Sequence, residues 1–108
     1  MGITINIYYS GAPGAARAFA DEMESSGTAA AVRAEEGNER YEYFIPLSDP
    51  DTVLLIDRWR DQAALDAHHA SPMMAVIAGL RDKHDLHMRV ERFTDFDGAS
   101  ADDGFIRT

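Results

Sequence analysis

The chain has 108 residues, of which 45% are hydrophobic, a formal net charge of −9 and no cysteine. Its length predicts one domain with a modest core, and its hydrophobic content excludes a disordered chain. The acidic balance disfavours nucleic acid and anionic membranes as partners, and the missing thiols exclude disulfides and a cysteine nucleophile. No basic-then-apolar leader and no apolar run approaching ~18 residues occurs, so the expected location is the cytoplasm.

The first half of the chain predicts a strand, a helix and two more strands. Apolar side chains alternate with polar ones over residues 3–8, and they recur at helical spacing over residues 15–26. Residues 28–33 have no clear period and are interpreted as a short extended or edge segment. Further strands are expected at residues 41–47 and 52–60, separated by the turn-forming sequence Ser-Asp-Pro-Asp.

The second half predicts two helices and a last strand. Asp61 is a suitable cap for a helix over residues 63–70, and a proline begins a further helix over residues 72–83. Alternation returns over residues 86–93. The order β-α-β-β-α-β is the ferredoxin-like pattern of an α+β fold, here a single domain over residues 1–93.

The last segment, residues 94–108, differs in composition from the rest of the chain. It carries four aspartates and two Asp-Gly pairs, and it is interpreted as a flexible acidic tail. Phe105 and Ile106 leave an alternative open, in which this tail docks on a partner subunit.

The third predicted strand indicates that the protein is a homodimer. Val53 and Leu55 share one face of this strand, and Leu54 and Ile56 share the other. Helices cover only one face of a ferredoxin-like sheet, so the second apolar face needs another cover. In so short a chain the simplest cover is the same sheet of a second copy.

An aromatic residue and two histidines follow in quick succession after this strand. Trp59 is interpreted both as a wall of a pocket for a flat substrate and as a large core aromatic. Neighbouring helical residues point about 100° apart, and the spacing from Leu65 selects His68 rather than His69 to face inward. An inward imidazole can transfer protons near neutral pH, and the alternative is a packed, hydrogen-bonded histidine.

Three further side chains are candidates for substrate contact. Asn6 interrupts a strand of β-branched residues and faces either solvent or a polar pocket. Met74 suits an adaptable apolar lining, and Tyr43 suits a substrate wall, with core or interface packing as the alternative for both.

The sequence predicts neither a metal site nor a bound cofactor. The polar segment from His84 to His87 has no further ligand at the spacing of a known metal site, and a polar turn explains it. No glycine-rich phosphate loop and no dinucleotide fingerprint is present.

The order of strand, Trp59, short turn and Ala-Leu-x-x-His resembles the antibiotic biosynthesis monooxygenase family. The similarity covers about Ile3 to Phe93 and also includes Gly37-Asn38-x-x-Tyr41 and Leu86-His87-Met88. The resemblance implies ferredoxin-like dimers, or dimeric α/β barrels, with a pocket between helices and sheet in each subunit. It also implies oxidation of anthrones or quinols by dioxygen without metal or flavin.

Some family positions differ in this chain. Members that oxidise polyketides place Asn four residues before the strand Trp and Tyr six residues after it, where this chain has Leu55 and Leu65. Haem-degrading relatives share an Asn at the position of Asn6. Their helix Trp is His68 here, and their axial His falls near Ala78, so haem degradation is disfavoured.

The resemblance therefore implies a homodimeric, cofactor-independent monooxygenase that oxidises a quinol, an anthrone or another electron-rich phenolic substrate. The implied roles are base or proton relay for His68, stacking wall for Trp59 and hydrogen-bond donor to the substrate for Asn6. Met74, Tyr43 and His69 are the expected substrate contacts. The alternative is a non-catalytic, small-molecule-binding or stress-associated dimer.

Overall fold

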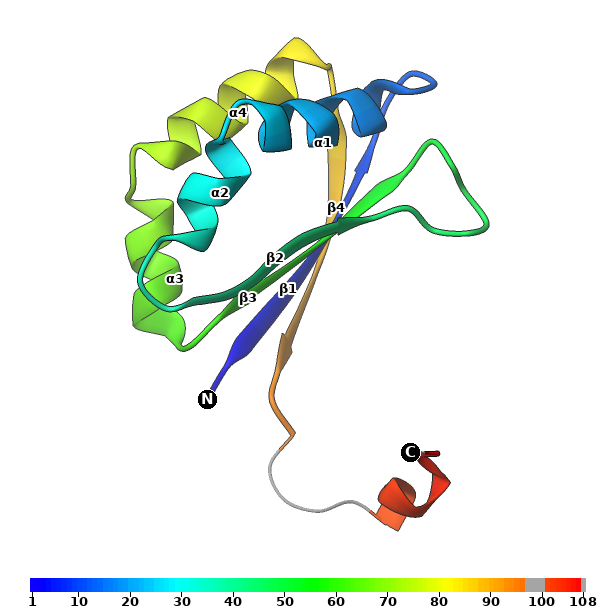
Figure 1. The fold of residues 1–108 in the computed structure, drawn as a ribbon, viewed down its shortest axis with the longest axis vertical. Coiled ribbons are helices and arrows are strands. Elements are labelled where there is room, and N and C mark those ends of the chain that lie inside the picture. The colour runs from blue at the N-terminus through cyan, green and yellow to red at the C-terminus, as the bar shows by residue number, and fades with distance from the viewer. Residues whose placement is uncertain (97–100, 108) are drawn as a thin grey trace.

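The computed structural model describes residues 1–96 and 101–107 (Figure 1). Four strands form one sheet, namely β1 (Ile3–Ser10), β2 (Asn38–Phe44), β3 (Val53–Trp59) and β4 (His87–Thr94). Four α-helices connect them, namely α1 (Ala15–Ser25), α2 (Thr28–Arg33), α3 (Gln62–His69) and α4 (Met73–Lys83). A short 3-10 helix, η1 (Ala101–Phe105), lies in the segment predicted to be a tail, of which residues 97–100 and 108 lie outside the described residues.

The sheet has the strand order β2-β3-β1-β4, and every neighbouring pair is antiparallel. The four α-helices lie on one side of this sheet, and its other side carries none of them (Figure 1). This arrangement confirms the predicted α+β, ferredoxin-like fold. No helix among the described residues is long and apolar enough to cross a bilayer.

The core lies between the helices and the inner face of β3. Val53, Leu55, Asp57 and Trp59 are all buried, and the residues between them are half-buried. The alternation follows from the two-residue period of a strand, which sends successive side chains to opposite faces. Asp57 is therefore a carboxyl group on a face that is otherwise apolar.

The prediction for residues 28–33 was wrong, because this segment is helix α2. Its sequence, Thr-Ala-Ala-Ala-Val-Arg, contains the strongest helix former three times. Ala29 and Val32 are fully buried one turn apart, so packing against the core completes a helix that is too short to be stable alone.

The boundaries of β2 also differ from the prediction, since the strand begins at Asn38 and ends at Phe44. Ile45 and Leu47 continue the alternation in sequence, yet both are exposed. The strand stops before Pro46, which has no amide hydrogen to donate to a neighbouring strand.

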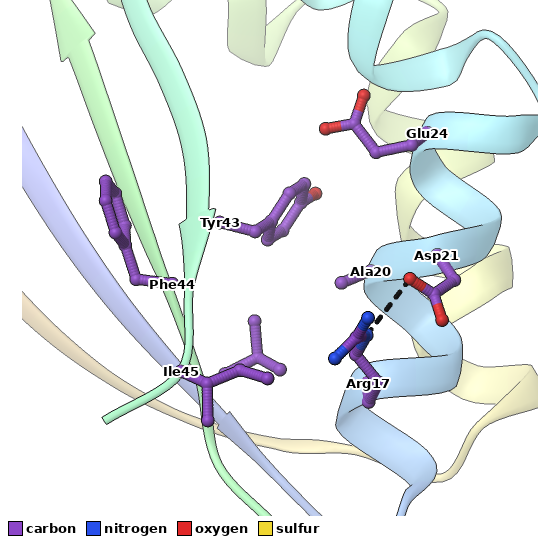
Figure 2. Close-up of a pocket in the computed structure, with 8 residues that line it drawn as sticks. Arg17, Ala20, Asp21, Glu24, Tyr43, Phe44 and Ile45 are labelled. Carbon is purple, nitrogen blue, oxygen red and sulfur yellow. Dashed lines mark hydrogen bonds and ion pairs between the residues drawn. The ribbon is translucent and has the colours of Figure 1, made fainter. Parts of the chain in front are cut away.

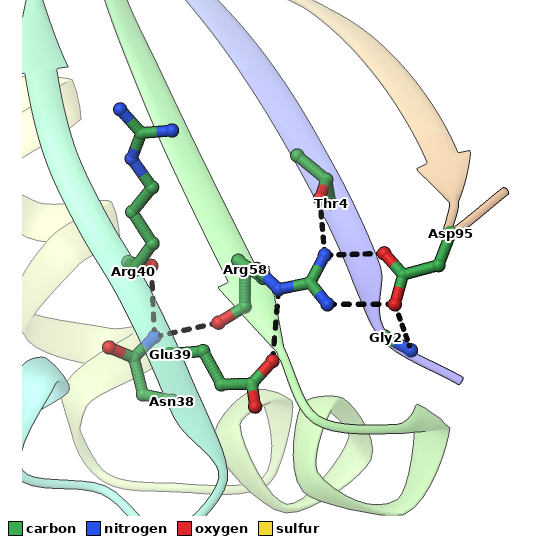
Figure 3. Close-up of polar contacts among 7 residues, drawn as sticks. All are labelled: Gly2, Thr4, Asn38, Glu39, Arg40, Arg58 and Asp95. Atoms are coloured by element: carbon green, nitrogen blue, oxygen red, sulfur yellow. Dashed lines mark hydrogen bonds and ion pairs between the residues drawn. The ribbon is translucent and has the colours of Figure 1, made fainter. Parts of the chain in front are cut away.

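On the side without helices, Arg58 joins three strands (Figure 3). Its guanidinium group donates two hydrogen bonds to Asp95, at 2.7 and 2.8 Å, and others to Glu39 and Thr4. Asp95 also accepts a hydrogen bond from the backbone amide of Gly2. This network fixes the chain where it leaves β4.

Candidate functional site

A cavity of about 180 Å³ lies between the inner face of the sheet and helices α3 and α4. Its walls combine apolar side chains with titratable and cationic groups, including Asp57, His68, His69, Met74, Arg81 and Arg92. We call it the His68 cavity. Apolar walls with a few convergent polar groups are typical of small-molecule sites.

His68 is held from two sides. Its Nδ1 lies 2.8 Å from Oε2 of Glu35, and its ring stacks on Trp59 with centroids 4.6 Å apart and planes at 24°. Only 4% of the side chain is exposed, as expected for the inward position on α3. Among the residues that the structure describes, no hydrogen bond reaches Nε2, so the fixed ring keeps one nitrogen for a ligand.

Asp57 is the second titratable group of the cavity. Its Oδ1 is buried without a hydrogen-bond partner, and 4% of the residue is exposed. Burial raises the pKa of Asp57 to about 7, the nearby indole N–H of Trp59 opposes this rise, and the charge of Glu35 adds to it. The indole nitrogen itself makes no hydrogen bond. Below that pH the group is a neutral acid that can donate a hydrogen bond.

Two buried tyrosines complete the inner wall. Burial raises the pKa of Tyr9 to about 12, although the charge of Arg81 opposes this shift. Burial likewise raises the pKa of Tyr41 far above its usual range. Both phenols remain neutral at physiological pH.

The outer part of the cavity is cationic. Arg81 on α4 is half-buried, and Arg92 on β4 is exposed. His69 also lines the cavity, and burial together with the charges of His68 and Arg92 lowers its pKa.

The structure brings together three of the predicted site residues, namely His68, His69 and Met74. Trp59 is fully buried behind His68, where it supports the imidazole, and it is absent from the cavity lining. Its placement fits the core interpretation rather than that of a substrate wall.

Asn6 and Tyr43 lie elsewhere. Asn6 pairs with Ile56 on the side of the sheet that lacks α-helices, because it alternates with the inward Ile5, and its Oδ1 has no hydrogen-bond partner. Tyr43 points into a different hollow of about 270 Å³ between α1 and β2 (Figure 2). There Arg17 pairs with Asp21, and Glu24 pairs with Arg33, so the charged groups are already satisfied. The His68 cavity is therefore the better candidate site.

Sequence reasoning missed Glu35, Asp57, Arg81 and Arg92 as members of the site. Glu35 lies in a segment whose sequence is typical of a turn, and the residue that it contacts, His68, lies 33 positions further along the chain. Asp57 did carry a signal, because an ionisable residue interrupts the apolar face of β3.

The side chains that could ligate a metal are dispersed over the molecule. Both described ranges, 1–96 and 101–107, contain no group of three or more His, Asp and Glu side chains arranged to hold a metal ion. His84 instead contacts Glu22, with Nε2 and Oε1 2.8 Å apart.

A four-stranded antiparallel sheet with helices on one face and a small cavity between the layers defines the class of ferredoxin-like α+β proteins. The family model described as "Antibiotic biosynthesis monooxygenase" matches residues 2–79. The chain therefore belongs to the antibiotic biosynthesis monooxygenase family, in agreement with the resemblance of its sequence.

The individual relatives match either over a short stretch or at low sequence identity. YcnE of Bacillus subtilis (strain 168), named as a candidate monooxygenase, is 38% identical over 37 residues, which are 34% of this chain and 39% of that protein. SnoaB of Streptomyces nogalater, a cofactor-independent oxygenase, superimposes with a TM-score of 0.73 at 18% identity over 90% of this chain and 95% of that one. Rv0793 of Mycobacterium tuberculosis gives a TM-score of 0.72 at 22% identity over 93% and 100%. These structures share the fold.

Proposed function

We propose that this protein is a cofactor-independent monooxygenase that oxidises a quinol, an anthrone or another electron-rich phenolic substrate with dioxygen in the His68 cavity. The observation that carries this proposal is the fixed imidazole. His68 contacts Glu35 through one nitrogen and presents the other in a cavity with apolar walls. Membership of a monooxygenase family supports the reaction class.

The reaction needs a base, a dry site and no external electrons. His68 takes a proton from the substrate, and the resulting anion gives an electron to dioxygen. The substrate radical and superoxide then combine to form a C–O bond, and the protonated His68 returns its proton to the peroxide, which gives a hydroperoxide. For an anthrone, loss of water then leaves a carbonyl at the former CH₂, so one CH₂ and one O₂ give one C=O and one H₂O. The substrate itself supplies all the electrons.

The other cavity residues bind and orient. Met74 is an adaptable apolar contact, and His69 is a polar contact in the same lining. Neutral Asp57 donates a hydrogen bond to a substrate oxygen, the task that sequence reasoning gave to Asn6. Burial of the site excludes water, which strengthens these polar interactions.

The working unit in this proposal is a homodimer. Leu54 and Ile56 are only half-buried on the side of the sheet without α-helices, and Phe93 is 51% exposed. A second copy covers this face most simply. The cytoplasmic location stays a prediction from sequence.

A specific observation favours the alternative, a non-catalytic small-molecule-binding dimer. His68 is 4% exposed and stacked on the fully buried Trp59, which is also the arrangement of a packed structural histidine.

A measurement of oxygen uptake distinguishes the monooxygenase from the non-catalytic dimer. We expect the purified protein, without added cofactor, to consume one O₂ per substrate from a panel of quinols and anthrones, without release of hydrogen peroxide. Binding of panel compounds without oxygen uptake would favour the non-catalytic dimer and contradict the proposal.

A further inference from the structure

Two arginines at the His68 cavity lack acidic partners, although the chain is rich in acid groups. The chain has ten Lys and Arg against 19 Asp and Glu. Seven of these cations form ion pairs, namely Arg17, Arg33, Arg40, Arg58, Arg60, Lys83 and Arg89. Within the described ranges this leaves Arg81, Arg92 and Arg107 without one. Two of the three line the same cavity.

The two arginines come from two different elements that border the cavity. Arg81 comes from α4, and its Nη1 lies 3.3 Å from the Met88 sulfur on β4, a weak acceptor that leaves the charge uncompensated. Arg92 comes from the inner face of β4, opposite Ile5 in register. It also lines an adjoining hollow with Ile3 and Gln62, which puts it at the outer rim.

The rest of the cavity is suited to a small aromatic ring. Ile5, Ile7, Leu55, Met74 and Ile77 supply apolar walls. A volume of about 180 Å³ is below the usual ~300 Å³ minimum of sites for drug-sized ligands, so one or two rings fit best.

We propose that Arg81 and Arg92 form an anion subsite, and that the substrate is a small hydroxylated aromatic carboxylic acid. Its carboxylate binds the two guanidinium groups while its hydroxyl faces His68. This inference rests on the proposed function for the claim that the hydroxyl end of the substrate reacts. The binding of the carboxylate end rests on the two arginines alone. Guanidinium groups bind carboxylates through paired, charge-assisted hydrogen bonds.

The charges around the subsite are consistent with this assignment. A net charge of −9 repels anions at long range, so an acidic ligand needs locally concentrated cations. Two carboxyl groups lie on the His68 side of the cavity, since Glu35 contacts His68 and Asp57 is buried on the inner face of β3. The acid and hydroxyl ends of the substrate therefore meet opposite kinds of group.

The test compares an acid with its neutral ester. Isothermal titration under anaerobic conditions, which prevent turnover, measures binding of 2,5-dihydroxybenzoate and its methyl ester. We expect the acid to bind at least tenfold more tightly than the ester. Arg81→Met and Arg92→Met should each weaken acid binding about tenfold and leave ester binding nearly unchanged.

Arg89→Met is the matched control, because Arg89 lies on the same strand, faces the other side of the sheet and pairs with Glu91. It should leave the affinity for the acid unchanged. Equal binding of acid and ester, or binding of neither, would overturn the subsite. The subsite would also be overturned if Arg81→Met and Arg92→Met altered dimer formation in sedimentation but did not weaken acid binding. Acid-selective binding without oxygen uptake would keep the subsite and contradict only the monooxygenase.

Discussion

His68 illustrates how a single side chain is prepared for proton transfer. Helix α3 aims it inward, Glu35 fixes one ring nitrogen, and Trp59 fixes the plane of the ring. Each constraint comes from a different part of the chain, so the imidazole has little freedom to turn away from the cavity.

Replacing His68 with Ala should keep the protein folded and slow turnover by roughly 10²-fold or more, because the base is lost. His69→Ala removes an imidazole from the next position, about 100° further round the helix, and should have a much smaller effect. The measurements are kcat on an accepted substrate and circular dichroism. Unchanged kcat in His68→Ala would refute the base, and loss of fold would support a structural histidine.

Asp57 should make stability depend on pH in an unusual direction. Its pKa is about 7 in the folded state, against the ordinary value of 3.8 that it regains in the unfolded chain, so the folded state binds more protons between these values. The free energy of unfolding should therefore fall as pH rises from about 4 to 7, by up to ~1.4 kcal/mol per pKa unit. Urea unfolding of the wild type and Asp57→Asn across this range measures the effect, which should shrink in the variant.

Asp95→Asn is a control of opposite sign. Hydrogen bonds from Arg58 lower the pKa of Asp95 to about 2, so its contribution is present above pH 4 and is lost as pH falls toward 2. Its replacement should leave the slope between pH 5 and 7 intact. The other carboxyl groups are the same in the wild type and in Asp57→Asn, so the difference between the two proteins isolates Asp57. If that difference shows a contribution that is constant or rises over this pH range, the assignment to Asp57 is contradicted.

At the scale of elements, strong periodicity and capping chemistry were sufficient to predict most of the fold. Asp61 caps α3 through a hydrogen bond from the Ala64 amide, as its position before the helix predicts. The prediction for residues 28–33 failed because the helical state of α2 depends on burial of Ala29 and Val32 against other elements, which the local sequence does not show. The predicted end of β2 was too late, because Ile45 and Leu47 continue the alternation of a strand but lie beyond Phe44, the last residue that pairs with β3.

The turn between α2 and β2 depends on Gly37. This residue has φ of 83°, and a Cβ there would collide with the Ala64 Cβ on α3. Its carbonyl accepts a hydrogen bond from the Arg60 amide at 2.8 Å, so the turn that carries Glu35 is held against the start of α3.

Gly37→Ala should therefore destabilise the protein by about 2 kcal/mol or more, through backbone strain and overpacking together. Gly14→Ala is the matched control, because Gly14 has φ of 80° and open space around its Cβ position. It should show the backbone cost alone, about 1 kcal/mol. Chemical denaturation of both variants gives the difference, and equal losses would show that the contact with α3 relaxes freely.

At the scale of the whole molecule, the site was harder to predict than the fold. His68, His69 and Met74 could be placed because helical geometry fixes their directions. Glu35 and Arg92 could not, because they reach the cavity through tertiary contacts between segments far apart in the chain. Asn6 was assigned by analogy with relatives, and strand alternation sends it to the opposite face.

That opposite face carries the last prediction. Leu54 and Ile56 lie at its centre on β3, and among the described residues no α-helix covers them. Phe93 on β4 pairs with Thr4 on the same face and is 51% exposed, which adds apolar surface for a second copy to cover. A stable dimer that buries more than ~1,000 Å² in total should form through this face.

Sedimentation at micromolar concentration should give about twice the 11.9 kDa chain mass. Ile56→Lys places a charge at the centre of the face and should yield a folded monomer, since an unpaired buried charge is strongly unfavourable at an interface. Val76→Lys adds the same charge on α4, where the side chain is 41% exposed, and should remain a dimer. A wild-type monomer, or a dimer that survives Ile56→Lys, would place the interface elsewhere, and Asn6 would then face solvent rather than a partner sheet.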